Sequence, residues 1–231
     1  MKAAPPILYE DNHLLVVVKP VNIPSQADDS GDRDLLTIIK DDLKGRYQKP
    51  GNVYLGLVHR LDRPVGGVMV FAKTSKAAAR LSEQIRTREF QKNYLAVIHG
   101  SPDGLKHCLQ HYLQKDQFNN IVKAFNKPHP EAKEAILEYE VIGRRDNFSL
   151  VKIHLTTGRS HQIRVQLAAI GHPLYGDQKY GAGLNKPGQQ IALWSAELNF
   201  KHPTRDEIMR FKIDPPKVYP WNLFEQTRPS T

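Results

Sequence analysis

A single carboxylate stands between two arginines in the segment His-Arg-Leu-Asp-Arg at positions 59–63. Apolar residues lead into this segment and the apolar run 68–72 follows it, which predicts a strand, a sharp polar turn and a second strand. Arg60 and Arg63 would lower the pKa of Asp62 and keep its side chain ionised. An ionised carboxylate on a rigid turn can act as a nucleophile, or it can close a hairpin as one arm of an ion pair. This segment alone favours neither role.

A tyrosine lies within a further predicted strand, at positions 91–99. A tyrosine in a half-buried strand usually belongs to the core and has its hydroxyl hydrogen-bonded. Tyr94 becomes a candidate for chemistry only if its ring stacks on a base or lies near Asp62.

A third segment, 158–164, begins with glycine and carries five polar side chains in seven residues. It leads into a predicted helix at about 160–170, and the N-terminus of a helix readily binds phosphate. His161 and Arg164 lie three apart and therefore share one face of that helix. The alternative is a helix cap followed by a surface arginine.

Ten histidines raise the question of a metal site. His107 and His111 lie four apart with Cys108 between them, a spacing that could bind zinc. A second ligand cluster of recognised spacing is missing from the sequence, so we expect scattered histidines and no metal. A metal-dependent hydrolase is kept only as a minor alternative.

The elements that must position these residues are mostly strands. The sequence predicts strands at 7–10, 13–19, 68–73, 91–99, 135–142, 148–155, 191–200 and 209–213, and helices at 34–47, 75–88 and 160–170. Segment 101–131 reads as an irregular excursion with short strands, and the end of the chain as a loose tail. We therefore predict the α+β class, with a predominantly antiparallel or mixed β-sheet and a few flanking helices.

Composition limits the class of protein further. The 231 residues suit one domain or two intimately packed subdomains, and one cysteine suits a reducing compartment. No apolar run approaches the roughly 20 residues that span a bilayer, so we expect a cytoplasmic protein. The net charge of +9 points to a polyanionic partner.

Five segments, taken in order, resemble those of RluA-type pseudouridine synthases, which modify RNA. These segments are 59–73, 92–100, 155–165, 171–181 and 198–203. The hairpin that ends in Lys19-Pro20 also fits this family. Family members usually carry Thr-Ser-Gly where this chain has Val65-Gly66-Gly67. We expect this departure to alter turn packing or backbone contacts with RNA, and not to remove the nucleophile.

The resemblance implies that the chain converts uridine in RNA to pseudouridine by detaching the base, turning it and rejoining it through carbon. Asp62 would be the catalytic carboxylate, and Arg164 would pair with it and hold it ionised. Tyr94 would stack under the uracil, and Arg60 would fill the place that the flipped uridine leaves in the RNA stack. The other implied site residues are the RNA contacts His59, Arg159, His161 and Gln162 and the pocket residues Leu61 and Ile163.

The resemblance also implies partners and domain organisation. The reaction is redox-neutral and retains the base, so no cofactor is expected. The expected substrate is a stem-loop of ribosomal or transfer RNA, and the protein is expected to be a monomer. Residues 1–231 would form a single catalytic domain without a separate N-terminal RNA-binding domain. The alternative is a non-catalytic RNA-binding or chaperone protein that retains the fold, which the basic charge and Val65-Gly66 both suggest.

Overall fold

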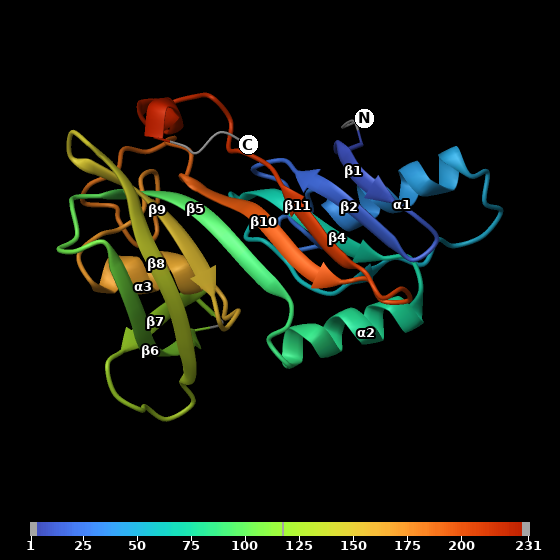
Figure 1. Cartoon of the computed structure of the whole chain (residues 1–231), viewed down its shortest axis with the longest axis horizontal. Helices are drawn as coiled ribbons and strands as arrows, with labels where there is room; N and C mark the ends of the chain where they lie inside the picture. The colour runs from blue at the N-terminus through green and yellow to red at the C-terminus, as the bar shows by residue number, and fades with distance from the viewer. Residues whose placement is uncertain (1–3, 117, 228–231) are drawn as a thin grey trace. The chain divides into compact units, whose positions relative to one another are not determined.

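The computed structural model describes residues 4–116 and 118–227, and the chain divides into two compact units (Figure 1). Unit 1 comprises Met1–Lys92 and Ser195–Asp214, and unit 2 comprises Asn93–Trp194 and Pro215–Thr231. Strands dominate both units, and the described residues include three α-helices. This composition confirms the predicted α+β class.

Unit 1 is a sheet with two helices. Its strands follow the order β1-β2-β4-β10, while β3 pairs with β4 and β11 pairs with β10. The bounds are β1 (Ile7–Glu10), β2 (Leu14–Lys19), β3 (Gly56–Leu57), β4 (Gly66–Ala72), β10 (Leu193–Lys201), β11 (Ile208–Lys212), α1 (Leu35–Arg46) and α2 (Ser75–Arg86). The pairs β1–β2, β2–β4, β3–β4 and β10–β11 are antiparallel. The chain enters unit 2 within β5 and returns within β10.

Both helices of unit 1 begin where the sequence predicts. The side chain of Asp34 accepts a hydrogen bond from Thr37 N and caps α1, and Thr74 caps α2 in the same way through Ala77 N. Four apolar residues at helical spacing on α1 are buried, namely Leu35, Ile38, Ile39 and Leu43. Helix α2 buries Leu81 in a core cluster that includes Phe90 from just beyond the helix and Leu198 and Phe200 from β10. The rings of Phe90 and Phe200 stack with centroids 5.0 Å apart.

Strand β4 is buried along its whole length, because it lies between β2 and β10 in the sheet and places Val68, Val70 and Ala72 in the core cluster. Gly67 on this strand has a φ of +119°, and a Cβ atom there would lie 2.2 Å from the carbonyl oxygen of Ser195. A side chain at position 67 would therefore force the backbone of β10 to move.

Unit 2 is built on antiparallel strands in the order β5-β9-β8-β6-β7. The bounds are β5 (Gln91–His99), β6 (Lys106–Asp116), β7 (Ile121–Phe125), β8 (Lys133–Arg145), β9 (Phe148–Leu155), α3 (Gln162–Ala169) and the 3-10 helix η1 (Trp221–Thr227). Helix α3 covers one face of this sheet, where Val165 packs with Leu113, Val122 and Ala135 (Figure 1). Gly171, with a φ of +84°, follows the end of α3 as predicted.

Two expectations for unit 2 are wrong. Segment 101–131, expected to be an irregular excursion with short strands, instead contains the 11-residue strand β6, which pairs with the short strand β7 as an antiparallel hairpin. The alternation of apolar and polar residues that marks a strand is hard to recognise in β6, because one of its inward-facing residues, His111, is polar although it is buried. Residues 221–227 likewise do not form a loose tail, since they make up η1 and bury Trp221 and Phe224.

Asp11 ties the β1–β2 turn of unit 1 to the segment after β10. Its carboxylate accepts hydrogen bonds from His13 N and Leu14 N, both at 2.7 Å, and from His202 Nε2 at 2.8 Å. Burial alone would raise the pKa of Asp11, but these bonds and one from the Tyr9 hydroxyl lower it to about 2. The ionised form of Asp11 therefore stabilises unit 1.

We expect Asp11→Asn to lower the free energy of unfolding by about 2 kcal/mol near neutral pH. The folded pKa is depressed, so this stability is present above the unfolded pKa of 3.8 and is lost as the pH falls towards about 2. Urea unfolding of both proteins across this acid range measures the effect. The two stability curves should converge as the pH falls, and a gap that is independent of pH would contradict the assignment.

None of the helices among the described residues has the length and apolar content that a bilayer crossing requires.

Candidate active site

The turn that carries Asp62 lies in unit 1 between the short strand β3 and the buried strand β4. The N–H of Val65 donates to the carbonyl oxygen of Asp62 at 2.9 Å and closes the turn. Leu61 and Val65 point inward, with 5% and 2% of their surface exposed, whereas Asp62 is half-buried and Arg60 is exposed. The predicted strand, turn and strand are thus present, and Leu61 forms part of the interior of unit 1.

Lys19, the last residue of β2, binds the carbonyl groups of this turn. Its Nζ atom donates to the carbonyl oxygens of Val65 at 2.7 Å, Arg63 at 3.1 Å and Asp62 at 3.4 Å, and to that of Pro20 at 3.1 Å. Lys19 is fully buried. Burial lowers the pKa of Lys19 to about 7, although the nearby Asp62 carboxylate opposes this change. In the sequence Lys19 stands out only as the end of a hairpin, and no neighbouring residue predicts this contact.

His59 holds the start of the turn. Strand β3 pairs Leu57 with Phe71, and the chain then leaves β4. The Nε2 atom of His59 accepts a hydrogen bond from Val70 N at 3.1 Å, which supplies β4 with an acceptor after the backbone of β3 has turned away. Burial, with a smaller effect of Lys92, lowers the pKa of His59 to about 3, so the ring is neutral. His59 therefore supports the turn through β4, and the expected RNA contact of His59 stays a prediction.

The arginine on the far side of Asp62 is engaged elsewhere. Arg63 forms ion pairs with Asp32 and, at 4.0 Å, with Asp28, both in the loop before α1. The buried cation at this turn is Lys19. Arg60, the other flanking arginine, is exposed and available to a partner in solution.

Tyr94 lies on β5 in unit 2 and is 6% exposed. It pairs with Ile153 of β9, which in turn pairs with Tyr139 of β8, so these side chains share one face of the sheet. That face is buried at all three positions. Burial on this face restricts the side chain of Tyr94. Such a placement suits a catalytic tyrosine and a core tyrosine equally well.

Arg164 lies on α3 and is 6% exposed. Within unit 2 it forms a two-pronged ion pair with Asp177, with Nε–Oδ2 at 2.8 Å and Nη2–Oδ1 at 2.9 Å, and its guanidinium lies 5.3 Å from the ring centre of Tyr180. Burial would raise the pKa of Asp177, but Arg164 and two backbone N–H groups lower it overall. The expected partner of Arg164 was Asp62, whereas Asp177, which comes 13 residues after Arg164, was not predicted as a partner.

The polar residues at the start of α3 and just before it divide into inward and outward ones. Gln162 is 3% exposed, and its Oε1 accepts from Thr157 Oγ1 and Arg159 N while its Nε2 donates to Ile136 O. The amide of Gln162 therefore organises this loop, and the expected RNA contact of Gln162 stays a prediction. Arg159 is exposed, and its Nε donates to Glu134 O at 3.0 Å.

The two remaining predicted site residues lie on or beside α3. The ring of His161 is half-buried, and its Nδ1 lies 2.7 Å from the Tyr180 hydroxyl. That hydroxyl also accepts a hydrogen bond from Val122 N at 2.9 Å, which ties His161 through Tyr180 to strand β7. Ile163, the second predicted pocket residue, is 4% exposed.

The geometry of β6 excludes a shared metal on His107 and His111. Residues four apart on a strand lie about 13 Å apart, too far for one ion, and Cys108 points to the opposite face. The ring of His111 lies against Gln166, with Nδ1 and Nε2 3.0 Å apart. Among the described residues, no group of three or more histidine, cysteine, aspartate and glutamate side chains could hold a metal.

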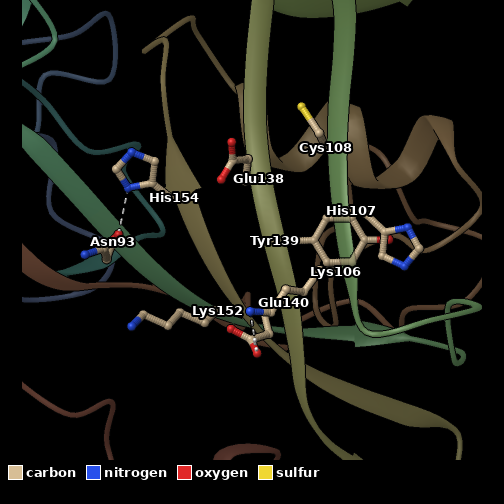
Figure 2. Close-up of a pocket in the computed structure, with 9 residues that line it drawn as sticks. All are labelled: Asn93, Lys106, His107, Cys108, Glu138, Tyr139, Glu140, Lys152 and His154. Carbon is tan, nitrogen blue, oxygen red and sulfur yellow. Dashed lines mark hydrogen bonds and ion pairs between the residues drawn. The ribbon is translucent and has the colours of Figure 1, made fainter.

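A hollow of about 480 Å³ lies over strands β5, β6, β8 and β9 of unit 2 (Figure 2). It is lined by Asn93, Lys106, His107, Cys108, Glu138, Tyr139, Glu140, Lys152 and His154. Lys106 pairs with Glu140 at 3.6 Å, and His154 Nδ1 lies 3.0 Å from Asn93 Oδ1. The charges of the two lysines and the two glutamates cancel, so the lining of this hollow carries no excess positive charge that would bind an anion.

Comparisons with known proteins identify the family. The sequence model of the RNA pseudouridylate synthase family matches residues 13–169. The chain is 32% identical over 206 residues to "Uncharacterized RNA pseudouridine synthase YhcT" of Bacillus subtilis, covering 88% of this chain and 66% of that protein. It is 34% identical over 207 residues to ribosomal large subunit pseudouridine synthase C of Buchnera aphidicola, covering 86% and 63%.

The chain therefore belongs to the RNA pseudouridylate synthase family, as the RluA-type segments predict. It spans about two thirds of the length of these two relatives. Its fold is that of human RNA pseudouridylate synthase domain containing 4, with a TM-score of 0.78 over 94% of this chain and 91% of that one, at 22% identity.

Proposed function

We propose that this chain isomerises specific uridines in structured RNA to pseudouridine. The observation that carries the proposal is the family match over residues 13–169, which contains Asp62, Tyr94 and Arg164. The basic charge of +9 suits an RNA partner. The relatives named for the large ribosomal subunit make ribosomal RNA the first substrate to test.

The proposed chemistry needs no oxidant and no added group. The bond between the ribose and uracil N1 breaks, a bond from the ribose to C5 forms, C5 loses a proton and N1 gains one. Asp62 is the proposed catalytic carboxylate, Tyr94 would stack under the uracil, and Arg164 is the proposed ion-pair partner of Asp62. Exposed Arg60 would fill the gap that the flipped uridine leaves, since flipping a base costs a few kcal/mol.

The structure of the turn supports an intact catalytic carboxylate despite Val65-Gly66. Val65 is buried, and its backbone joins the turn through Asp62 O and Lys19 Nζ. Lys19 and His59 bind main-chain atoms, so neither contact depends on a hydroxyl at position 65 or 66. This favours the enzyme over the alternative of a non-catalytic RNA-binding protein.

The test treats unmodified RNA with the protein and maps pseudouridine at single-nucleotide resolution. Ribosomal and transfer RNA are assayed side by side, with mock-treated RNA as the control. We expect new pseudouridines at one or a few uridines in stem-loops. If RNA binds but no new site forms in either class, the non-catalytic alternative replaces the proposal. Action as a monomer in the cytoplasm, without a cofactor, stays a prediction.

A further inference from the structure

The hydroxyl of Ser25 binds both main-chain groups of Leu61, the residue immediately before Asp62. Ser25 Oγ donates to the Leu61 carbonyl oxygen at 2.7 Å and accepts from Leu61 N at 3.2 Å. Ser25 is only 4% exposed and Leu61 only 5% exposed. Without this hydroxyl, a buried N–H and a buried carbonyl would lose their partner, which is costly away from water.

Ser25 is itself anchored by helix α1. Its carbonyl oxygen accepts from Leu36 N at 3.3 Å, and the preceding carbonyl, of Pro24, accepts from Leu35 N at 2.8 Å. Asp34 caps the same helix. The position of Leu61 is thus fixed through Ser25 to the first turn of a 12-residue helix.

The contacts of Ser25 and Lys19 are complementary. Lys19 binds carbonyl groups at and after Asp62, whereas Ser25 binds the residue before it. Through these bonds both residues contact the backbone at and around Asp62, so they fix its Cα position from both directions.

We propose that Ser25 is a positioning residue for Asp62 in the reaction. The inference rests on the proposed function and adds a residue that neither the family match nor the sequence motifs single out. Catalysis depends on placing reacting groups within a fraction of an ångström, so freeing Leu61 should slow the chemical step more than it weakens RNA binding.

The experiment compares Ser25→Ala with Ser149→Ala under single-turnover conditions. Ser149 is also buried, and its hydroxyl donates to a backbone carbonyl, Gly100 O, at 2.8 Å, but in unit 2. We expect both variants to lose similar thermal stability. Only Ser25→Ala should lose rate at saturating RNA, by roughly ten- to a hundredfold, with RNA affinity unchanged.

The outcomes separate this inference from the proposed function. If the unaltered chain forms no pseudouridine, the proposed function fails. If it is active and folded Ser25→Ala keeps the full rate, or loses rate only in step with Ser149→Ala, the positioning role is overturned. Should Ser25→Ala fail to fold, Ser25→Cys takes its place, because a thiol is close in size but a weak donor and acceptor. A full maximal rate in that variant would equally overturn the inference.

Discussion

Asp62→Asn is expected to reduce the rate of pseudouridine formation by about a thousandfold while the protein stays folded and binds RNA. Asparagine has nearly the shape of aspartate but no negative charge, so it is neither a nucleophile nor a base. The turn should tolerate the change, because the contacts from Lys19 and Val65 are made to the backbone carbonyl of residue 62. The loss should therefore fall on chemistry alone.

Three measurements on the same preparations establish this result. Single-turnover assays on a mapped target uridine give the rate, titration of the same RNA gives the affinity, and thermal unfolding gives the stability. Ser149→Ala serves as the control for a small buried change elsewhere. An Asp62→Asn protein that retains the full rate would exclude Asp62 as the catalytic carboxylate.

Lys19→Met is expected to lower the free energy of unfolding by about 3 kcal/mol and to reduce activity as well. Methionine fills a similar volume but leaves the carbonyl groups of Pro20, Asp62, Arg63 and Val65 without their shared donor. Chemical unfolding measures the loss. Lys73→Met is the matched control, since Lys73 also lies in unit 1 but its Nζ binds the Glu10 carboxylate and lies over the Tyr47 ring instead of binding backbone carbonyls. Equal losses in the two variants would contradict the special role of Lys19.

The stability that involves Lys19 should also depend on pH. The folded pKa of about 7 lies below the ordinary value of 10.5, so between these values the unfolded chain binds the proton and the folded chain does not. Stability then rises with pH in this window for the unaltered protein relative to Lys19→Met. Unfolding curves at several pH values in this range measure the difference, and parallel curves would show that Lys19 keeps its proton when buried.

Local sequence signals predicted much of this fold. Asp34 and Thr74 precede apolar residues at helical spacing, so the starts of α1 and α2 could be read from neighbouring residues. The Asp62 turn was equally visible, because apolar runs flank a polar segment. Strand β6 escaped prediction because the apolar alternation that marks a strand is broken by His111 on its inner face.

The residues that hold the Asp62 turn in place could not be predicted in the same way, since they lie far from it in the sequence. Lys19 and Ser25 reach the turn from 36 to 46 positions away in the chain, and a lysine at the end of a strand ordinarily reads as exposed. A motif also does not tell which way its side chains point. His59 and Gln162 stand beside the predicted catalytic residues, yet both turn inward to bind backbone.

The discontinuity of unit 1 has a consequence for how the protein is made. Its first 92 residues leave the ribosome before the whole of unit 2, and its remaining strands, with Leu198 and Phe200, follow more than a hundred residues later. Until then Phe90 lacks its stacking partner and β4 lacks β10. The sheet that carries the Asp62 turn therefore stays incomplete, with apolar side chains uncovered, until residues 195–214 have been synthesised.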